Sequence, residues 1–262
     1  MTTHGLFSQS GGLAWHAKAW FRHRRLWADF TGRIAVFLHE WQSELAKTTS
    51  DGSSPLGQHN AAQQPPALPG LIICGPSAGW CLPKDGFLEH FESLVLIDPD
   101  PLAQRFFNQR HAATLPKQQE RIWISSTFER VLPALLKRHP HHAVLFCNVL
   151  GQLRYRDNTP LERIEFELGQ LKTTLQGRHW ASFHDRISAE VPHTALLERE
   201  FFEPGPVQSV TLAKRVAAKG EWLDHLTEHV LPSEVSRRCI GWPISPNRLH
   251  WVEAGWVCGQ RQ

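Results

Sequence analysis

Short apolar runs alternate with helical stretches from Leu71 to Ile187, and this alternation restricts the fold more than any other feature. The apolar runs suit strands that are buried on both faces. Strands separated by helices pair in parallel, because the crossover helix returns the chain to the same edge of the sheet. We expect strands at Leu71–Cys74, Leu94–Ile97, Arg121–Ile124, Ala143–Cys147 and Trp180–Ile187, and helices at Pro101–His111, Phe128–Arg138 and Thr159–Gln176.

The last part of the chain departs from this alternation. Arg237–Trp242 and Leu249–Val257 are β-type runs joined by a short turn at Ser245–Arg248, so they must pair antiparallel. The preceding stretch, Ser188–Ser236, is longer than one crossover needs, and we expect helices in it near Thr194–Phe202 and Glu221–Val230. The predicted fold is α/β, a doubly wound, mostly parallel seven-stranded sheet with a C-terminal antiparallel hairpin.

The N-terminal part reads as a separate helical segment. Leu26–Leu45 has an apolar stripe with a 3.6-residue period, which predicts an amphipathic helix. The following residues, 47–69, hold four prolines, many polar residues and no aromatic residue, which is typical of a flexible linker. We therefore predict an N-terminal helical cap over 1–46, a linker over 47–69, and an α/β domain over 70–262 with an insertion at about 188–236.

Composition excludes several classes of protein. The chain has 262 residues, 41% of them hydrophobic, and a net charge of +3, which is neither a membrane-spanning nor a disordered composition. Met1–Gly12 shows no secretory signal, and five cysteines at no metal-binding spacing favour reduced thiols, so we expect a cytoplasmic protein. We expect no metal site, because the histidines of His139–His142 fit a solvated turn before the fourth strand. The sequence does not indicate an oligomeric state.

Two loops that follow strands have the residues of a nucleotide-type site. Gly75-Pro76-Ser77-Ala78-Gly79 follows the first strand, and glycines there let the backbone approach a ligand closely. Asp98 ends the second strand, where a carboxylate is well placed to accept hydrogen bonds from both hydroxyls of a ribose. Because the carboxyl ends of parallel strands meet at one edge of the sheet, we expect both loops to face one ligand.

With these loops in this order, the stretch from Leu71 to Val257 resembles the class I S-adenosylmethionine-dependent methyltransferase superfamily. The polar end of the third strand, the segment Phe146–Leu153 after the fourth and the terminal hairpin complete the likeness. The hairpin separates this superfamily from NAD-binding Rossmann domains. The resemblance implies S-adenosyl-L-methionine as cofactor, and as cofactor-binding residues Gly75, Pro76, Ser77, Gly79, Asp98, Ser126, Thr127, Asn148 and Val149.

The resemblance also implies an enzyme that transfers a methyl group. We expect the N-terminal helix and the insertion to roof the acceptor pocket, which favours a small-molecule acceptor over a polymer. The candidate catalytic residues are Asn148, His184 and Asp185, which follow or end strands near the expected cleft. A general base such as His184 is needed only if the bound acceptor is protonated. For each of these side chains, a purely structural hydrogen bond is an alternative interpretation.

Two other functions stay open from the sequence. The basic cluster Arg22–Arg25 suits an RNA or DNA methyltransferase, although no Asn-Pro-Pro-Tyr-like segment follows the fourth strand. A non-catalytic binding protein that keeps the fold is the second alternative, since Cys74 stands where family members carry an acidic residue and Ser126 where the third strand usually ends in aspartate. Nothing indicates a membrane partner.

Overall fold

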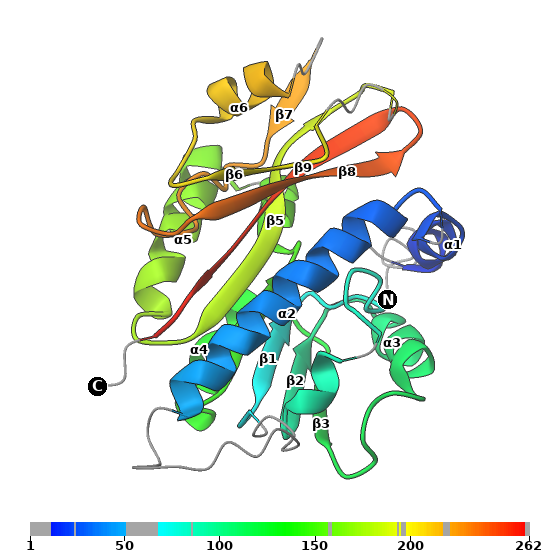
Figure 1. The fold of residues 1–262 in the computed structure, drawn as a ribbon, viewed down its shortest axis with the longest axis vertical. Coiled ribbons are helices and arrows are strands. Elements are labelled where there is room, and N and C mark those ends of the chain that lie inside the picture. Colours follow the sequence, from blue (N-terminus) through cyan, green and yellow to red (C-terminus); the bar gives the residue numbers. More distant parts are fainter. Residues whose placement is uncertain are drawn as a thin grey trace.

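A nine-stranded sheet forms the centre of the computed structural model, which describes residues 12–23, 25–50, 68–84, 86–156, 159–192, 194, 198–216 and 221–259 (Figure 1). The strand order is β3-β2-β1-β4-β5-β9-β8-β6, and β7 pairs with β5. Five adjacent strands pair in parallel, and they are β1 (Leu71–Cys74), β2 (Ser93–Ile97), β3 (Glu120–Ile124), β4 (Ala143–Cys147) and β5 (Trp180–Ala189).

The other strands extend this parallel sheet with antiparallel pairs. β9 (Arg248–Val257) lies between β5 and β8 (Arg237–Ser245) and is antiparallel to both. β6 (Glu200–Glu203) pairs with the outer edge of β8. β7 (Trp222–Asp224) pairs with the end of β5 that extends beyond β4. The α/β architecture is thus as predicted, and each of the five parallel strands matches its predicted range to within two residues.

Helices cover both faces of the sheet. α4 (Phe128–Arg138) and α5 (Leu161–Thr174) pack on one face, where they share a hydrophobic cluster with Ile72, Val144 and Phe146. α3 (Ala103–His111) lies on the other face with α2 (Ala28–Ser50), the long helix that crosses the sheet in Figure 1. Successive side chains of a strand point to opposite faces, so each buried strand supplies apolar residues to both layers.

The N-terminal helices share a core with the sheet. α1 (Gly12–His23) precedes α2, and α2 is continuous through Thr31-Gly32. Phe30 and Trp41 of α2 are fully buried, and they belong to one hydrophobic cluster with residues of the sheet, among them Ile73 and Trp242. The predicted linker over 47–69 falls largely on residues 51–67, which lie outside the described residues.

The insertion differs from its prediction. We expected helices near Thr194–Phe202 and Glu221–Val230, but β6 and β7 occupy parts of these ranges, and the described helix is α6 (Ser209–Arg215). Pairing with β8 and β5 overrides the local helical pattern there, and Leu226 has φ of 62°, which a helix does not allow. These two strands raise the count from the predicted seven to nine.

No helix within the described ranges combines the length and the apolar character that a membrane span requires.

Candidate functional site

The loop after β1 turns sharply at the point where the strand order of the sheet reverses. β1 pairs with β2 on one side and β4 on the other, so the strand order reverses at β1, and open α/β sheets bind ligands at the carboxyl edge of such a point. Gly75 has φ of 70°, and a Cβ built there would lie 2.6 Å from the Cβ of Val149. Glycine therefore lets the β1 and β4 loops approach each other.

Asp98 is hydrogen-bonded to the β1 loop. Its Oδ2 accepts a hydrogen bond from the backbone N–H of Ser77 at 2.7 Å, and its Oδ1 accepts one from the N–H of Asp100 at 2.9 Å. Burial raises the pKa of Asp98 to about 6, and the two backbone N–H groups oppose part of that rise. The structure thus joins the predicted glycine loop to the predicted ribose-binding carboxylate.

Four other predicted cofactor residues have structural surroundings of their own. Pro76 is buried within the β1 loop, and a Cβ on Gly79 would overlap the imidazole of His111, so tight packing on α3 already requires glycine at that position. Ser126 and Thr127 follow β3, two strands away from β1, and Thr127 is the N-cap residue of α4. Their contact with a cofactor stays a prediction.

Asn148 connects the end of β4 to β5. It has φ of 50°, and its side-chain Oδ1 accepts a hydrogen bond from the backbone N–H of Asp185 at 2.9 Å. Its Nδ2 donates to Oδ2 of Asp185 at 3.2 Å. β5 pairs with β4 only through Phe183, so Asp185 lies just beyond the carboxyl end of β4. Two of the three predicted catalytic residues therefore lie together at the expected edge of the sheet.

Asp185 is the centre of a buried polar cluster. Its Oδ1 lies 3.0 Å from Nδ1 of His250, which is on β9. His225, which follows β7, lies close enough that one ligand atom from each of these three residues falls within 4.8 Å of the other two. Gln152 adds a donor 3.4 Å from Oδ2 of Asp185. We name Asp185, His225 and His250 the edge cluster.

The edge cluster holds one buried negative charge, on the carboxylate of Asp185. Burial alone would raise the pKa of Asp185, but His250, His225 and the Asn148 amide lower it below its ordinary value, so the carboxyl group is ionised. Burial lowers the pKa of His225, the neighbouring imidazole of His250 adds to that lowering, and Asp185 opposes it. A neutral imidazole beside an ionised carboxylate can accept a proton or bind a cation.

His184 does not reach the edge cluster. Adjacent residues of a strand point to opposite faces, so His184 lies on the side away from Asp185. There it is fully buried, with Nδ1 2.8 Å from Oγ of Ser182 and Nε2 3.5 Å from Oε1 of Glu253. The predicted placement of His184 beside Asp185 over the cleft is therefore wrong, and its surroundings are those of a structural side chain.

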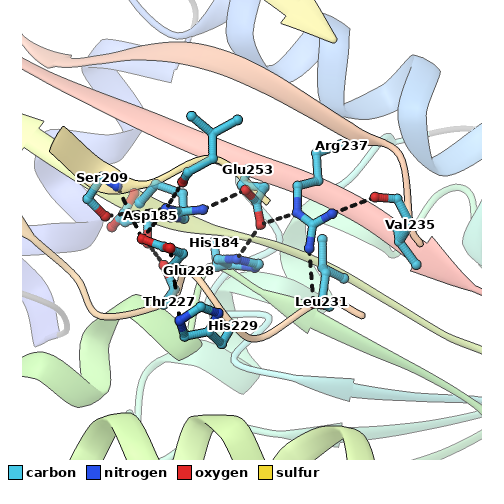
Figure 2. Close-up of polar contacts among 12 residues, drawn as sticks. His184, Asp185, Ser209, Thr227, Glu228, His229, Leu231, Val235, Arg237 and Glu253 are labelled. Atoms are coloured by element: carbon cyan, nitrogen blue, oxygen red, sulfur yellow. Dashed lines mark hydrogen bonds and ion pairs between the residues drawn. The ribbon is translucent and has the colours of Figure 1, made fainter. Parts of the chain in front are cut away.

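Glu253 lies among buried cationic side chains on the same face of the sheet as His184, as Figure 2 shows. Its Oε2 accepts a hydrogen bond from Nη1 of Arg186 at 2.7 Å, and Nε of Arg237 lies 3.4 Å from its Oε1. The guanidinium of Arg237 also donates to the carbonyl oxygens of Leu231 and Val235. These contacts tie β5, β8 and β9 together beside the site.

No protein-family model and no curated protein matches this chain. Among solved structures, magnesium protoporphyrin IX methyltransferase (ChlM) from Synechocystis PCC 6803, determined with bound SAM, is similar over 83% of this chain and 78% of its own, at 13% identity and a TM-score of 0.35.

Sequence reasoning missed His225 and His250. His225 lies in the insertion, in a range predicted to be helical, and His250 lies in the last strand between apolar neighbours. A histidine on an otherwise apolar, centrally placed strand is a signal of a buried polar site, because such a side chain needs a partner. The partner, Asp185, is 65 residues away in the chain, since 250 − 185 = 65, so only the β5–β9 pairing reveals the contact.

The tryptophans near the strand ends have structural roles. Trp180 and Trp242 are buried in the two hydrophobic layers, and Trp242 stacks on Phe30 with ring centroids 4.6 Å apart. Trp80 is also buried, and its Nε1 donates to Nδ1 of His16 on α1. His16 in turn lies 3.1 Å from Oδ2 of Asp100, so α1 is held against the loop that follows β2.

Proposed function

We propose that this protein is an S-adenosylmethionine-dependent methyltransferase that acts on a small-molecule acceptor. The observation that carries this proposal is the hydrogen bond between the β1 loop and Asp98, at the point where the strand order reverses, together with a polar cluster just beyond β4. The loop and its carboxylate suit the nucleoside of the cofactor. In this proposal the polar cluster faces the acceptor that receives the methyl group.

The residues present fit this cofactor. Each oxygen of Asp98 accepts one backbone hydrogen bond and keeps a second acceptor position, which suits the two hydroxyls of a ribose. The absence of a side chain at Gly75 lets the β1 loop pack directly against Val149 of the β4 loop, so both predicted cofactor loops lie side by side. In this proposal the cofactor is held by Gly75, Pro76, Ser77, Gly79, Asp98, Ser126, Thr127, Asn148 and Val149.

S-adenosylmethionine supplies a methyl group that is already activated by the sulfonium centre. The chain therefore has to position an acceptor and exclude water, and alignment of this kind lowers a barrier by about 7–11 kcal/mol. Asn148 is held rigidly by its two hydrogen bonds to Asp185. We propose that these two residues orient the acceptor.

Two observations favour a small molecule over a nucleic acid. Arg22, from the basic cluster, donates a hydrogen bond to the carbonyl oxygen of Ile244 at 2.9 Å, so part of that cluster holds α1 on the hairpin. His225 of the insertion belongs to the edge cluster, which supports a role of the insertion in enclosing the acceptor. All five cysteines are free, which supports a reducing, cytoplasmic compartment.

The decisive experiment is calorimetric titration with S-adenosylmethionine and S-adenosylhomocysteine. We expect binding of both, and we expect Asp98→Ala to weaken it by about 1.5–3 kcal/mol through lost hydrogen bonds to a charged group. Glu120→Ala, at the opposite end of the parallel strands, is the matched control and should leave the affinity unchanged. Failure of the wild-type protein to bind either compound at millimolar concentration would refute the proposal. Binding without transfer to any acceptor would support the non-catalytic alternative.

The pH dependence of binding gives a separate test of Asp98. Because its pKa is raised to about 6, Asp98 is ionised at pH 7 and mostly protonated at pH 5. A protonated carboxyl accepts hydrogen bonds less well, so the affinity for S-adenosylhomocysteine should fall roughly tenfold between pH 7 and pH 5. Asp98→Asn should remove this dependence. An equal dependence in Asp98→Asn would assign it to another group.

A further inference from the structure

We propose that the edge cluster is a binding site for one divalent transition-metal ion of the Zn²⁺ type, held by Asp185, His225 and His250. The three side chains come from β5, from the residue after β7 and from β9, and each offers a nitrogen or oxygen atom within 4.8 Å of the others. Two imidazoles and one carboxylate form a common ligand set for such ions, with coordination positions left for other ligands.

The contact between Asp185 and His250 has the spacing of two ligands of one ion. Oδ1 and Nδ1 are 3.0 Å apart, yet among the described residues neither atom has a hydrogen-bond partner in acceptable geometry. Ligand atoms about 2.0–2.2 Å from an ion, at angles of about 90–109°, lie roughly 3 Å from each other. Both side chains are more than nine-tenths buried, so an unmet polar atom in either is costly.

The surrounding groups orient the ligands as outer contacts of a metal site do. Nδ1 of His225 lies 3.1 Å from the carbonyl oxygen of Gly151, which fixes the proton on that nitrogen and leaves the Nε2 lone pair for a ligand bond. Nε2 lies 3.2 Å from Oγ of Ser188, a hydroxyl that can rotate away. These contacts are the usual means of holding a metal-binding histidine.

The carboxylate of Asp185 is oriented in the same way. The amides of Asn148 and Gln152 both donate to its Oδ2, at 3.2 and 3.4 Å. Oδ1 is thereby left to face His250 and to bind an ion through a single oxygen. A cluster with two imidazoles suits Zn²⁺, Co²⁺ or Fe²⁺ better than Mg²⁺, which prefers oxygen ligands.

An ion here would hold an oxygen or nitrogen of the acceptor beside Asn148. That use rests on the proposed methyl transfer, whereas binding of the ion does not. Metal titrations without S-adenosylmethionine, and titrations of the metal-free protein with S-adenosylhomocysteine, therefore separate the two proposals.

The test uses the untagged full chain after removal of metal by a chelator. Titration with Zn²⁺ should show one tight equivalent per chain, and Co²⁺ should give a visible absorption band that Zn²⁺ abolishes. His250→Ala and Asp185→Asn should each weaken Zn²⁺ binding by about a hundredfold or more, and the outer-contact variant Asn148→Ala by about 10–100-fold. His141→Ala, in the exposed histidine turn, is the control and should bind Zn²⁺ like the wild type.

Several results would overturn the proposal. One is no tight Zn²⁺ or Co²⁺ equivalent in the folded wild-type protein, judged by circular dichroism. Another is tight binding that survives in both His250→Ala and His225→Ala. X-ray absorption of the wild type with one equivalent of Zn²⁺ needs no variant to fold. It should show nitrogen and oxygen at about 2.0–2.1 Å, and a sulfur ligand at about 2.3 Å would place the ion at a cysteine instead.

Discussion

Replacing Glu253 by glutamine is expected to lower the free energy of unfolding by about 3–5 kcal/mol. Glu253 and Arg186 are both 1% exposed at the side chain and form an ion pair of 2.7 Å, and Arg237 and His184 face the same carboxylate. The substitution removes the negative charge that lies between two buried guanidinium groups. Among the described residues, Arg186 then keeps only the more distant carboxylate of Glu228, at 3.6 Å, and Arg237 keeps only carbonyl oxygens. Urea denaturation of wild type and variant at pH 7 measures the loss.

Glu40→Gln is the matched control for this prediction. Glu40 pairs with Arg238 at 2.7 Å, but its side chain is 44% exposed, and an exposed pair of this kind contributes about 0–1 kcal/mol. A loss below 1 kcal/mol in Glu253→Gln would contradict the view that the buried charges depend on each other.

The effect of Glu253 should also depend on pH, with a definite sign. Burial alone would raise the pKa of Glu253, but His184, Arg186 and Arg237 lower it below its ordinary value of 4.5. A carboxyl group with a lowered pKa stabilises the folded state fully above its unfolded pKa, and this stabilisation is lost as the pH falls. The difference between wild type and Glu253→Gln should therefore shrink below about pH 4.5. A difference that grows in acid would contradict this assignment.

Phe30→Ala is expected to lower the free energy of unfolding by about 3–5 kcal/mol, because it empties a ring-sized space between α2 and the sheet. Phe30 is fully buried, and its ring is stacked on Trp242 of β8 at an interplanar angle of 7°. Since α2 and the sheet share this core, we expect a single unfolding transition by circular dichroism and tryptophan fluorescence.

The control is Val36→Ala on the same helix. Val36 is 53% exposed, so its loss should cost no more than about 0.5 kcal/mol. Two separate transitions in Phe30→Ala, with the sheet unfolding as in the wild type, would support an N-terminal cap that folds independently.

The regular part of the fold could be predicted because its signals are local. A five-residue apolar run such as Ala143–Cys147 is typical of a strand buried between two layers, and β4 covers that range. The insertion lacked such a signal. Phe201 is buried in a small cluster beside β8, and the strand that contains it exists because β8 offers a free edge. Such pairing depends on residues far away in the chain.

The candidate site likewise has one part that the sequence predicts and one part that it does not. Gly75 and Asp98 each follow a strand, and parallel pairing brings the ends of neighbouring strands together, so sequence order was enough to associate them. His184 was assigned to the wrong surroundings because its neighbours in space come from β9 rather than from the adjacent sequence. The alternation of strand side chains separates it from Asp185, although the two residues are consecutive.

The layered α/β sheet, the glycine loop and the carboxylate after β2 follow from apolar periodicity and from the residue types at strand ends, which are local properties of the chain. The contact of His225 and His250 with Asp185, and the position of Glu253 among buried cations, depend instead on pairing between distant segments. β9 lies antiparallel between β5 and β8, and the register of that pairing selects which polar side chains share a face.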